Sequence, residues 1–219
     1  MFDATVSTAA SVPPKSGGVP KQLVMFLHGL GADGHDLIGL APEMADALPD
    51  AQFISPDAPY PCDMAPTGKQ WFSLQSRETA HMKTGVDAAA PLLNQYIDKI
   101  LEEYNLNIEQ LFVVGFSQGT MMALHTLLTR AHACGAIVGF SGAIIASRDF
   151  VSTVTARPPV CLIHGEMDDV VQFAAMPDAQ GALNKADVEV EAHPQPNLGH
   201  SINPQGLQAA IAFIQKYIK

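Results

Sequence analysis

Two near copies of one motif each place a serine directly after an apolar run. Ser117 lies in "VVGFSQG" (113–119) and Ser141 lies in "IVGFSGA" (137–143). A serine becomes a nucleophile in the G-x-S-x-G motif, where a strand ends in a sharp turn between small residues and a helix N-terminus then faces the developing negative charge. The surroundings of each serine therefore decide which one could carry out chemistry.

The first serine has the context that this motif requires. Gly115 and Gly119 flank Ser117, and residues 118–130 continue without proline in a pattern typical of a helix packed under a sheet. Ser141 has alanine in place of the second glycine, and two isoleucines and a polar break follow it. We predict that Ser117 is the nucleophile and that Ser141 is the polar end of a central strand.

A serine nucleophile needs a histidine base, and the base needs an acid that orients and stabilises it. In this motif the order along the chain is serine, acid, histidine. His164 and His193 end apolar runs, so we expect structural or supporting roles for them. His200, in "NLGHSINP", follows a glycine and precedes a helix start, and it is the predicted base.

The acid is expected directly after the apolar run "PVCLIHG". The next residues include Glu166, Asp168 and Asp169. Adjacent side chains diverge at a turn, so only one aspartate should face the imidazole, and the other would be solvated or cap the helix near Phe173. Position alone leaves Asp168 and Asp169 as alternatives.

Acyl transfer also needs two N–H donors where the carbonyl oxygen becomes negative. The amide of Gln118, directly after the nucleophile, is one candidate. The glycines of "FLHGLGADGHD" would let a second amide from residues 28–31 turn to the same point, and we expect it to be that of Leu30. These glycines lack the G-x-G-x-x-G spacing of dinucleotide loops, so we expect no nucleotide cofactor.

The elements that must position these residues alternate along the chain. Apolar, β-branched runs predict strands, and the longer segments between them predict helices, so the sequence indicates an α/β protein with a mostly parallel, doubly wound sheet. Ligands bind at the carboxyl edge of such sheets, where the candidate residues lie. The predicted strands are 22–29, 51–59, 111–117, 136–142, 159–165 and 188–193, and the predicted helices are 41–48, 86–104, 118–130, 173–185 and 204–217.

Residues 57–85 do not fit this alternation. The segment is long and shows no clear period, and it holds the only tryptophan of the chain, Trp71. Long loops in compact domains are often functional, so one interpretation is a flap over the site; the other is that Trp71 fills the core. Met64, Trp71, Phe72 and Leu74 of this segment are candidate substrate contacts.

Length, composition and charge predict the domain organisation and argue against some classes of partner. The 219 residues, 47% of them hydrophobic, suit one domain over 21–219, preceded by an N-terminal segment, 1–20, that is extended or partly ordered. The net charge of −10, without a basic cluster, argues against nucleic acid.

The cysteines and the apolar runs indicate in which cellular compartment the protein is expected. The three cysteines, read as free thiols, indicate a reducing compartment. Neither a secretory signal nor an apolar span of membrane length is evident. We therefore expect a cytoplasmic protein without stable membrane insertion.

The motifs together resemble those of a known family. "FLHGLGADG", "PDAPYPCDM…WFSL", "VVGFSQGTMMALH", "HGEMDDVV" and "LGHSI" are similar to the phospholipase/carboxylesterase group of α/β hydrolases, the relatives of acyl-protein thioesterases. The resemblance implies an α/β-hydrolase fold without a separate cap domain and without a metal or organic cofactor. Carried over by motif, it implies the triad Ser117, Asp168 and His200, with Leu30 and Gln118 as the oxyanion hole. Asp169 stands where many relatives have proline, which keeps it an alternative acid.

The resemblance implies a serine carboxylesterase acting on small-molecule esters, and possible thioesters, of short to medium acyl chains. Lysophospholipase and acyl-protein thioesterase are the nearest alternatives. A dienelactone-hydrolase-like enzyme fits less well, because that class usually has a cysteine nucleophile. A non-catalytic binding protein on this fold would normally show a broken triad. An exposed apolar flap could also support a homodimer.

Overall fold

One seven-stranded sheet organises the chain, with the strand order β1-β3-β2-β6-β7-β8-β9. The computed structural model describes residues 4–145 and 150–218. β1 pairs antiparallel with β3, and all other neighbours in this sheet are parallel. The strands are β1 (Ser7–Val12), β2 (Gln22–Leu27), β3 (Ala51–Asp57), β6 (Leu111–Phe116), β7 (Ala136–Phe140), β8 (Val160–Gly165) and β9 (Val190–Gln195), and a separate hairpin joins β4 (Tyr60–Pro61) and β5 (Lys69–Gln70).

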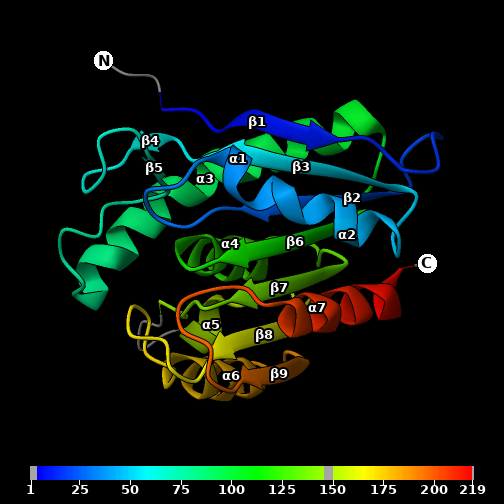
Figure 1. Ribbon diagram of the computed structural model, residues 1–219. Coiled ribbons are helices and arrows are strands. Elements are labelled where there is room, and N and C mark those ends of the chain that lie inside the picture. The colour runs from blue at the N-terminus through cyan, green and yellow to red at the C-terminus, as the bar shows by residue number, and fades with distance from the viewer. Residues whose placement is uncertain (1–3, 146–149, 219) are drawn as a thin grey trace.

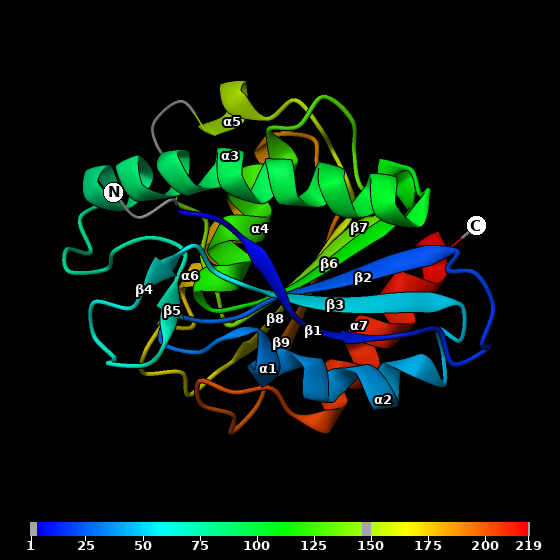
Figure 2. The same ribbon diagram turned by 90° about the horizontal axis from the view of Figure 1, so that it is seen from above.

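Helices cover both faces of the sheet. Figure 2 shows α3, α4, α5 and α6 on one face and α1, α2 and α7 on the other. This arrangement and the parallel strand order are those of the predicted α/β-hydrolase fold. The helices are α1 (Gly34–Leu37), α2 (Ala41–Ala45), α3 (Thr79–Tyr104), α4 (Gln118–Leu128), α5 (Phe150–Thr153), α6 (Ala175–Lys185) and α7 (Pro204–Tyr217).

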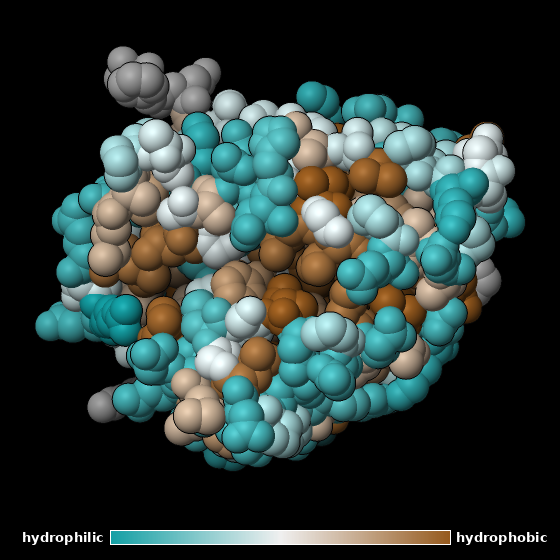
Figure 3. Space-filling model, in the orientation of Figure 1, coloured by the Kyte–Doolittle hydropathy of each residue, from teal (hydrophilic) through white to brown (hydrophobic). Residues whose placement is uncertain are grey.

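Each face of the sheet buries its own apolar cluster. Strand residues alternate between the two clusters, as the pleat requires: Leu23 and Met25 of β2 face α3 and α4, whereas Val24 and Phe26 face α2 and α7. On the second face some members are only partly covered, and Figure 3 shows apolar side chains reaching the surface between α2 and α7. Every helix of the described residues is too short or too polar to cross a membrane.

Several elements were not expected from the sequence, among them the short helices α1 and α5. β1 lies within the predicted N-terminal segment, of which residues 1–3 fall outside the described part of the chain. Three of its six residues are polar and exposed and the other three are only partly buried, as an edge strand permits. The segment 57–85 contains the β4–β5 hairpin and the first turns of α3, which begins at Thr79 rather than at residue 86. These first turns are largely exposed, so they carry little of the apolar periodicity on which a helix prediction depends.

The register of the sheet brings the candidate residues to one edge. Leu27 is level with Gly115, Phe116 with Phe140, and Phe140 with Ile163. The loops that follow β2, β6, β7 and β8 therefore emerge side by side, together with the β4–β5 hairpin, at the left of Figure 1. This is the carboxyl edge at which ligands bind in open α/β sheets.

The second glycine of the serine motif sets how closely α4 approaches β2. A Cβ atom at Gly119 would lie 1.9 Å from the carbonyl oxygen of Leu27. A Cβ at Gly115 would lie 2.6 Å from the amide nitrogen of Thr120. Both contacts are with backbone, which cannot move aside as a flexible side chain can. The glycines are therefore required by the turn between β6 and α4.

This close approach predicts opposite effects for two glycine-to-alanine changes. Gly119→Ala should destabilise the protein by about 3 kcal/mol or more, because overpacking against backbone is poorly relieved. A Cβ at Gly181, in α6, would meet no described atom within 4 Å apart from its chain neighbours and the helix's own backbone, so Gly181→Ala should stabilise the protein by about 0.5–1 kcal/mol through helix propensity. Thermal unfolding of both variants beside the wild type measures this. Equal melting temperatures for the two variants would contradict the packing argument.

Candidate active site

Ser117 lies on a strained turn between β6 and α4. Its backbone has φ 53° and ψ −115°, a conformation that few non-glycine residues adopt. The Ser117 amide donates to the carbonyl of Phe140 on the neighbouring strand at 2.9 Å, which holds the turn against β7. The helix begins at the next residue. The turn therefore places the hydroxyl at the N-terminus of α4, beyond the carboxyl edge of the sheet.

His200 and Asp168 come from the loops after β9 and β8. His200 Nδ1 lies 2.7 Å from Asp168 Oδ2, and the side chain of Asp168 is fully buried. The other carboxylate oxygen, Oδ1, accepts from the amides of Val170 and Val171, each at 2.9 Å. The carboxylate is thus held on both sides, and it fixes one face of the imidazole.

The two loops are also tied to each other. The amide of Met167 donates to the carbonyl of Leu198 at 2.9 Å. A Cβ at Gly165 would lie 2.2 Å from the same carbonyl oxygen, so this glycine permits the approach. After His200, Asn203 caps α7 by accepting from the amide of Gly206 at 2.7 Å. These contacts determine where both loops lie and so set the His200–Asp168 pair.

The electrostatics of Asp168 keep its carboxylate ionised. Burial by itself raises the pKa of the Asp168 carboxyl, but the hydrogen bonds from His200 and from the amides of Val171 and Val170 outweigh burial and lower this pKa below its ordinary value. A carboxylate that stays negative can orient the imidazole and stabilise its protonated form.

One cavity of about 470 Å³ opens onto both Ser117 and His200. The ring of Phe116 lies against the imidazole of His200, with 4.8 Å between the ring centroids. The remaining wall is mostly apolar, with one arginine and one carboxylate. The lining residues are Gly29, Leu30, Leu74, Arg77, Met82, Phe116, Ser117, Met121, Asp169, Val170, Val171, Gln172 and His200. In the described part of the chain, no group of three His, Cys, Asp or Glu side chains is arranged to hold a metal ion.

Two backbone amides beside Ser117 have the placement expected of oxyanion donors. Within the described residues, neither the Leu30 nor the Gln118 amide has a hydrogen-bond acceptor. Gln118 is the first residue of α4, and a Cβ at Gly29 would lie 3.5 Å from the Cβ of Ser117. Leu30 lines the cavity as well. The first residue of α4 and the loop after β2 therefore both lie beside the nucleophile.

The segment that begins after β3 is bonded to both of these loops. The side chain of Gln118, which is fully buried, accepts from the Trp71 amide at 2.9 Å and donates to the Phe72 carbonyl at 2.7 Å. The Gly31 amide donates to the carbonyl of Lys69 at 2.9 Å. Residues 57–72 are therefore a support for the site rather than a free flap. The sequence suggested only the backbone of Gln118 as functional, because the partners of its side chain are distant in the chain.

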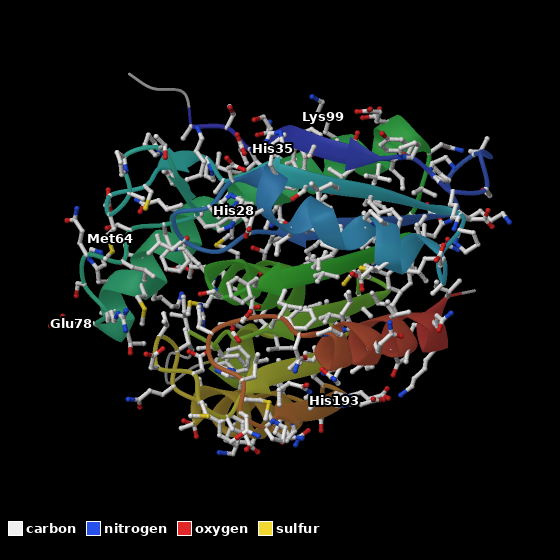
Figure 4. The ribbon with its side chains drawn as sticks, in the orientation of Figure 1. His28, His35, Met64, Glu78, Lys99 and His193 are labelled. Carbon is white, nitrogen blue, oxygen red and sulfur yellow. The ribbon has the colours of Figure 1, made fainter. Side chains whose placement is uncertain are left out.

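The four predicted substrate contacts have different places. Leu74 lines the cavity. Trp71 and Phe72 are buried in the core cluster under α3, so the interpretation in which Trp71 fills the core is the one that the structure supports. Met64 is 66% exposed on the loop between β4 and β5, where Figure 4 shows it at the edge of the molecule. Contact with substrate was wrongly assigned to Trp71 and Phe72, since large aromatic side chains more often pack than bind.

The alternative histidines lie outside the cavity lining. His193 is on β9 beside Glu191, far from His28 and the β2 loop in Figure 4. His164 is buried and lies next to the acid: its Nε2 is 2.8 Å from the Val171 carbonyl and 3.2 Å from Asp168 Oδ2. His164 therefore contacts the same carboxylate as His200, which is consistent with its expected supporting role.

The glycines of the second serine motif have a packing role. Ser141 is 1% exposed, and its Oγ has no hydrogen-bond partner among the described residues. Cβ atoms at Gly139 and Gly142 would lie 2.5 and 2.3 Å from side-chain atoms of Thr120, which donates to the Phe140 carbonyl. The glycines around Ser141 thus make room for the first turn of α4.

Comparisons with known proteins identify the family of the chain. A family model described as phospholipase/carboxylesterase matches residues 10–218. The chain is 28% identical to the esterase YpfH of Escherichia coli strain K12 (87% of this chain, 81% of the relative), and 26% identical to acyl-protein thioesterase 1 of Gibberella zeae (89% and 90%). The crystal structure of esterase PE8 superposes with a TM-score of 0.92 at 36% identity, covering 97% of this chain and 99% of that chain.

The contacts of Asp168 predict a large effect of its amide analogue. Asp168→Asn should lower kcat for ester hydrolysis by about 10³–10⁴, because asparagine neither selects the same imidazole tautomer nor stabilises the imidazolium. Asp169→Asn should have a much smaller effect, since Asp169 makes no bond to His200. Steady-state kinetics on a p-nitrophenyl ester distinguish the two variants. An equal loss of kcat in both variants would contradict the assignment of Asp168 as the acid.

Proposed function

The chain belongs to the phospholipase/carboxylesterase family, and from this premise we propose that it hydrolyses carboxylic esters through Ser117, His200 and Asp168. The observation that carries the proposal is the cavity that contains Ser117, on its strained turn, together with His200, whose other face is bonded to Asp168. Acyl transfer requires a nucleophile and a base that face the same cavity and an acid that orients the base.

Hydrolysis proceeds in two halves. Nε2 of His200 takes the proton of Ser117 Oγ as the oxygen attacks the ester carbonyl carbon. The bond to the alkoxy group then breaks, and the imidazolium gives its proton to the leaving alcohol. A water molecule next gives a proton to His200 and attacks the acyl-enzyme, which releases the carboxylic acid and returns the proton to Ser117.

The developing negative charge needs its own support. During each attack the carbonyl oxygen becomes an anion, and the Leu30 and Gln118 amides can donate to it from two sides. One such donor is worth about 3 kcal/mol of transition-state stabilisation in other hydrolases. Asp168 stabilises the imidazolium at the same moment, since its carboxylate stays ionised.

The two serine motifs offer a matched pair of variants. Ser117→Ala should abolish ester hydrolysis and labelling by a fluorophosphonate probe. Ser141→Ala, in the near-copy motif, should retain labelling, because the buried hydroxyl of Ser141 makes no hydrogen bond to the described part of the chain. Gel-based probe labelling with mass spectrometry of the labelled peptide measures both. A wild-type protein that stays unlabelled, or a label on Ser141, would contradict the proposed nucleophile.

The cavity favours acyl groups of short to medium length as substrates. Leu74, Met82 and Met121 line it, and the guanidinium of Arg77 donates to the Val170 carbonyl at 3.4 Å, joining two of the segments that line the cavity. An acyl chain would bury its methylenes against these side chains, and the alcohol would leave toward solvent. A thioester with the same acyl group presents the same carbonyl to Ser117, so we propose thioesters as a second substrate class.

A chain-length series tests this assignment. Among p-nitrophenyl esters, kcat/KM should rise with each added methylene until the cavity is filled and should then fall. Each buried methylene should stabilise the transition state by up to about 0.8 kcal/mol. Leu74→Trp should move the optimum to shorter chains, because it reduces the space beside Ser117. An acyl thioester of the best length gives the relative preference. If Leu74→Trp slowed all chain lengths equally, Leu74 would not limit the acyl group.

A further inference from the structure

The Gly29–Leu30 peptide presents one end to the cavity and the other to the interior. If the Leu30 N–H stabilises the oxyanion, as the proposed function requires, its direction matters. In a planar trans peptide the N–H and the preceding C=O point in opposite directions. The described residues contain no cis peptide. Whatever holds the Gly29 carbonyl therefore also aims the Leu30 N–H.

The side chain that holds this carbonyl is His28, at the end of β2. Its Nδ1 lies 2.7 Å from the Gly29 carbonyl oxygen. A carbonyl oxygen can only accept, so Nδ1 must carry a proton. The other ring nitrogen, Nε2, accepts from the amide of Ala58 at 3.0 Å, so it must be bare. The two bonds together select the neutral tautomer with the proton on Nδ1.

The surroundings of His28 keep the ring in this state. The residue is fully buried, near the carboxyl end of β2 in Figure 4. Burial lowers the pKa of the His28 imidazole below its ordinary value, although the Gly29 carbonyl and the carboxylates of Asp57, Asp33 and Asp36 each act to raise it.

Trp71 holds the backbone of the same residue. Its indole N–H donates to the His28 carbonyl at 3.0 Å, and the two rings lie 5.6 Å apart between centroids. The ring and the backbone of His28 are therefore both fixed.

We propose that His28 is a positioning residue: its Nδ1–H holds the Gly29 carbonyl so that the Leu30 N–H points at the carbonyl oxygen of the substrate. The inference rests on the proposed function and adds a residue that does not itself touch the substrate. The histidines at the ends of β2 and β8 then have parallel tasks, since His28 bonds the oxyanion loop and His164 bonds the loop of the acid.

Asparagine and glutamine at position 28 test the two hydrogen bonds of the His28 imidazole one at a time. The Asn amide nitrogen can occupy the place of Nδ1 and donate to Gly29, but asparagine has nothing at the place of Nε2. The Gln amide oxygen can occupy the place of Nε2 and accept from Ala58, but glutamine has nothing at the place of Nδ1. Gln is also closer to His in size. Packing and positioning therefore predict opposite rankings for His28→Asn and His28→Gln.

With ester substrates, His28→Gln should lower kcat by about 10- to 100-fold with little change in KM, somewhat less than the loss of a whole oxyanion donor. His28→Asn should stay within about tenfold of the wild type even if it melts at a lower temperature. Steady-state kinetics, with circular dichroism to check folding, give both readouts. If His28→Gln were the more active variant, or if KM alone changed, the positioning role would be wrong.

A measurement on the unaltered protein tests the inference if neither variant folds. The ¹⁵N chemical shifts of the His28 ring should show a protonated Nδ1 and a bare Nε2 at neutral pH. A proton on Nε2 would overturn the proposal. Ser117→Ala keeps the two failures apart: an active Ser117→Ala variant contradicts the proposed function, whereas an inactive one with the wrong His28 tautomer contradicts only the role of His28.

Discussion

The contact between the first turn of α4 and the end of β2 is the constraint on which the site depends. Gly119 lets the helix approach until its Cα lies against the Leu27 carbonyl, and the Ser117 amide bonds to the Phe140 carbonyl on the other side. The turn is therefore held between two strands. These two contacts fix the strained backbone of Ser117 and place Gly29 beside the serine. A bulkier residue at the glycine would separate the nucleophile from the loop that supplies a donor.

Segments that are far apart in the sequence each contribute one functional group to the site around Ser117. The loop after β8 supplies a carboxylate, and the amides of Val170 and Val171 and the imidazole of His164 surround it. The β4–β5 region bonds to the oxyanion loop and, through the side chain of Gln118, to the helix that begins at the nucleophile. The buried polar groups of the site are thus bonded mainly to backbone, which gives fixed positions with few mobile side chains.

Much of the fold could be predicted because the central strands are buried on both faces. Their sequences are almost continuously apolar, and all six predicted strands overlap observed ones. β1 was not predicted, because an edge strand needs no apolar pattern and its pairing with β3 depends on residues far along the chain. The length of residues 57–85 suggested a flap, but hydrogen bonds to Gln118 and Gly31 fix part of this segment.

The sequence by itself determined the family, the fold and a short set of candidates, because the serine turn needs glycines at fixed spacing and the order serine, acid, histidine follows the strand order. Only the tertiary structure decided between Asp168 and Asp169 as the partner of His200, since adjacent side chains at a turn point in different directions. It also decided that Trp71 is core and that Leu74 faces the cavity. Local sequence states which groups are present, whereas the direction of a side chain depends on partners that only folding brings near.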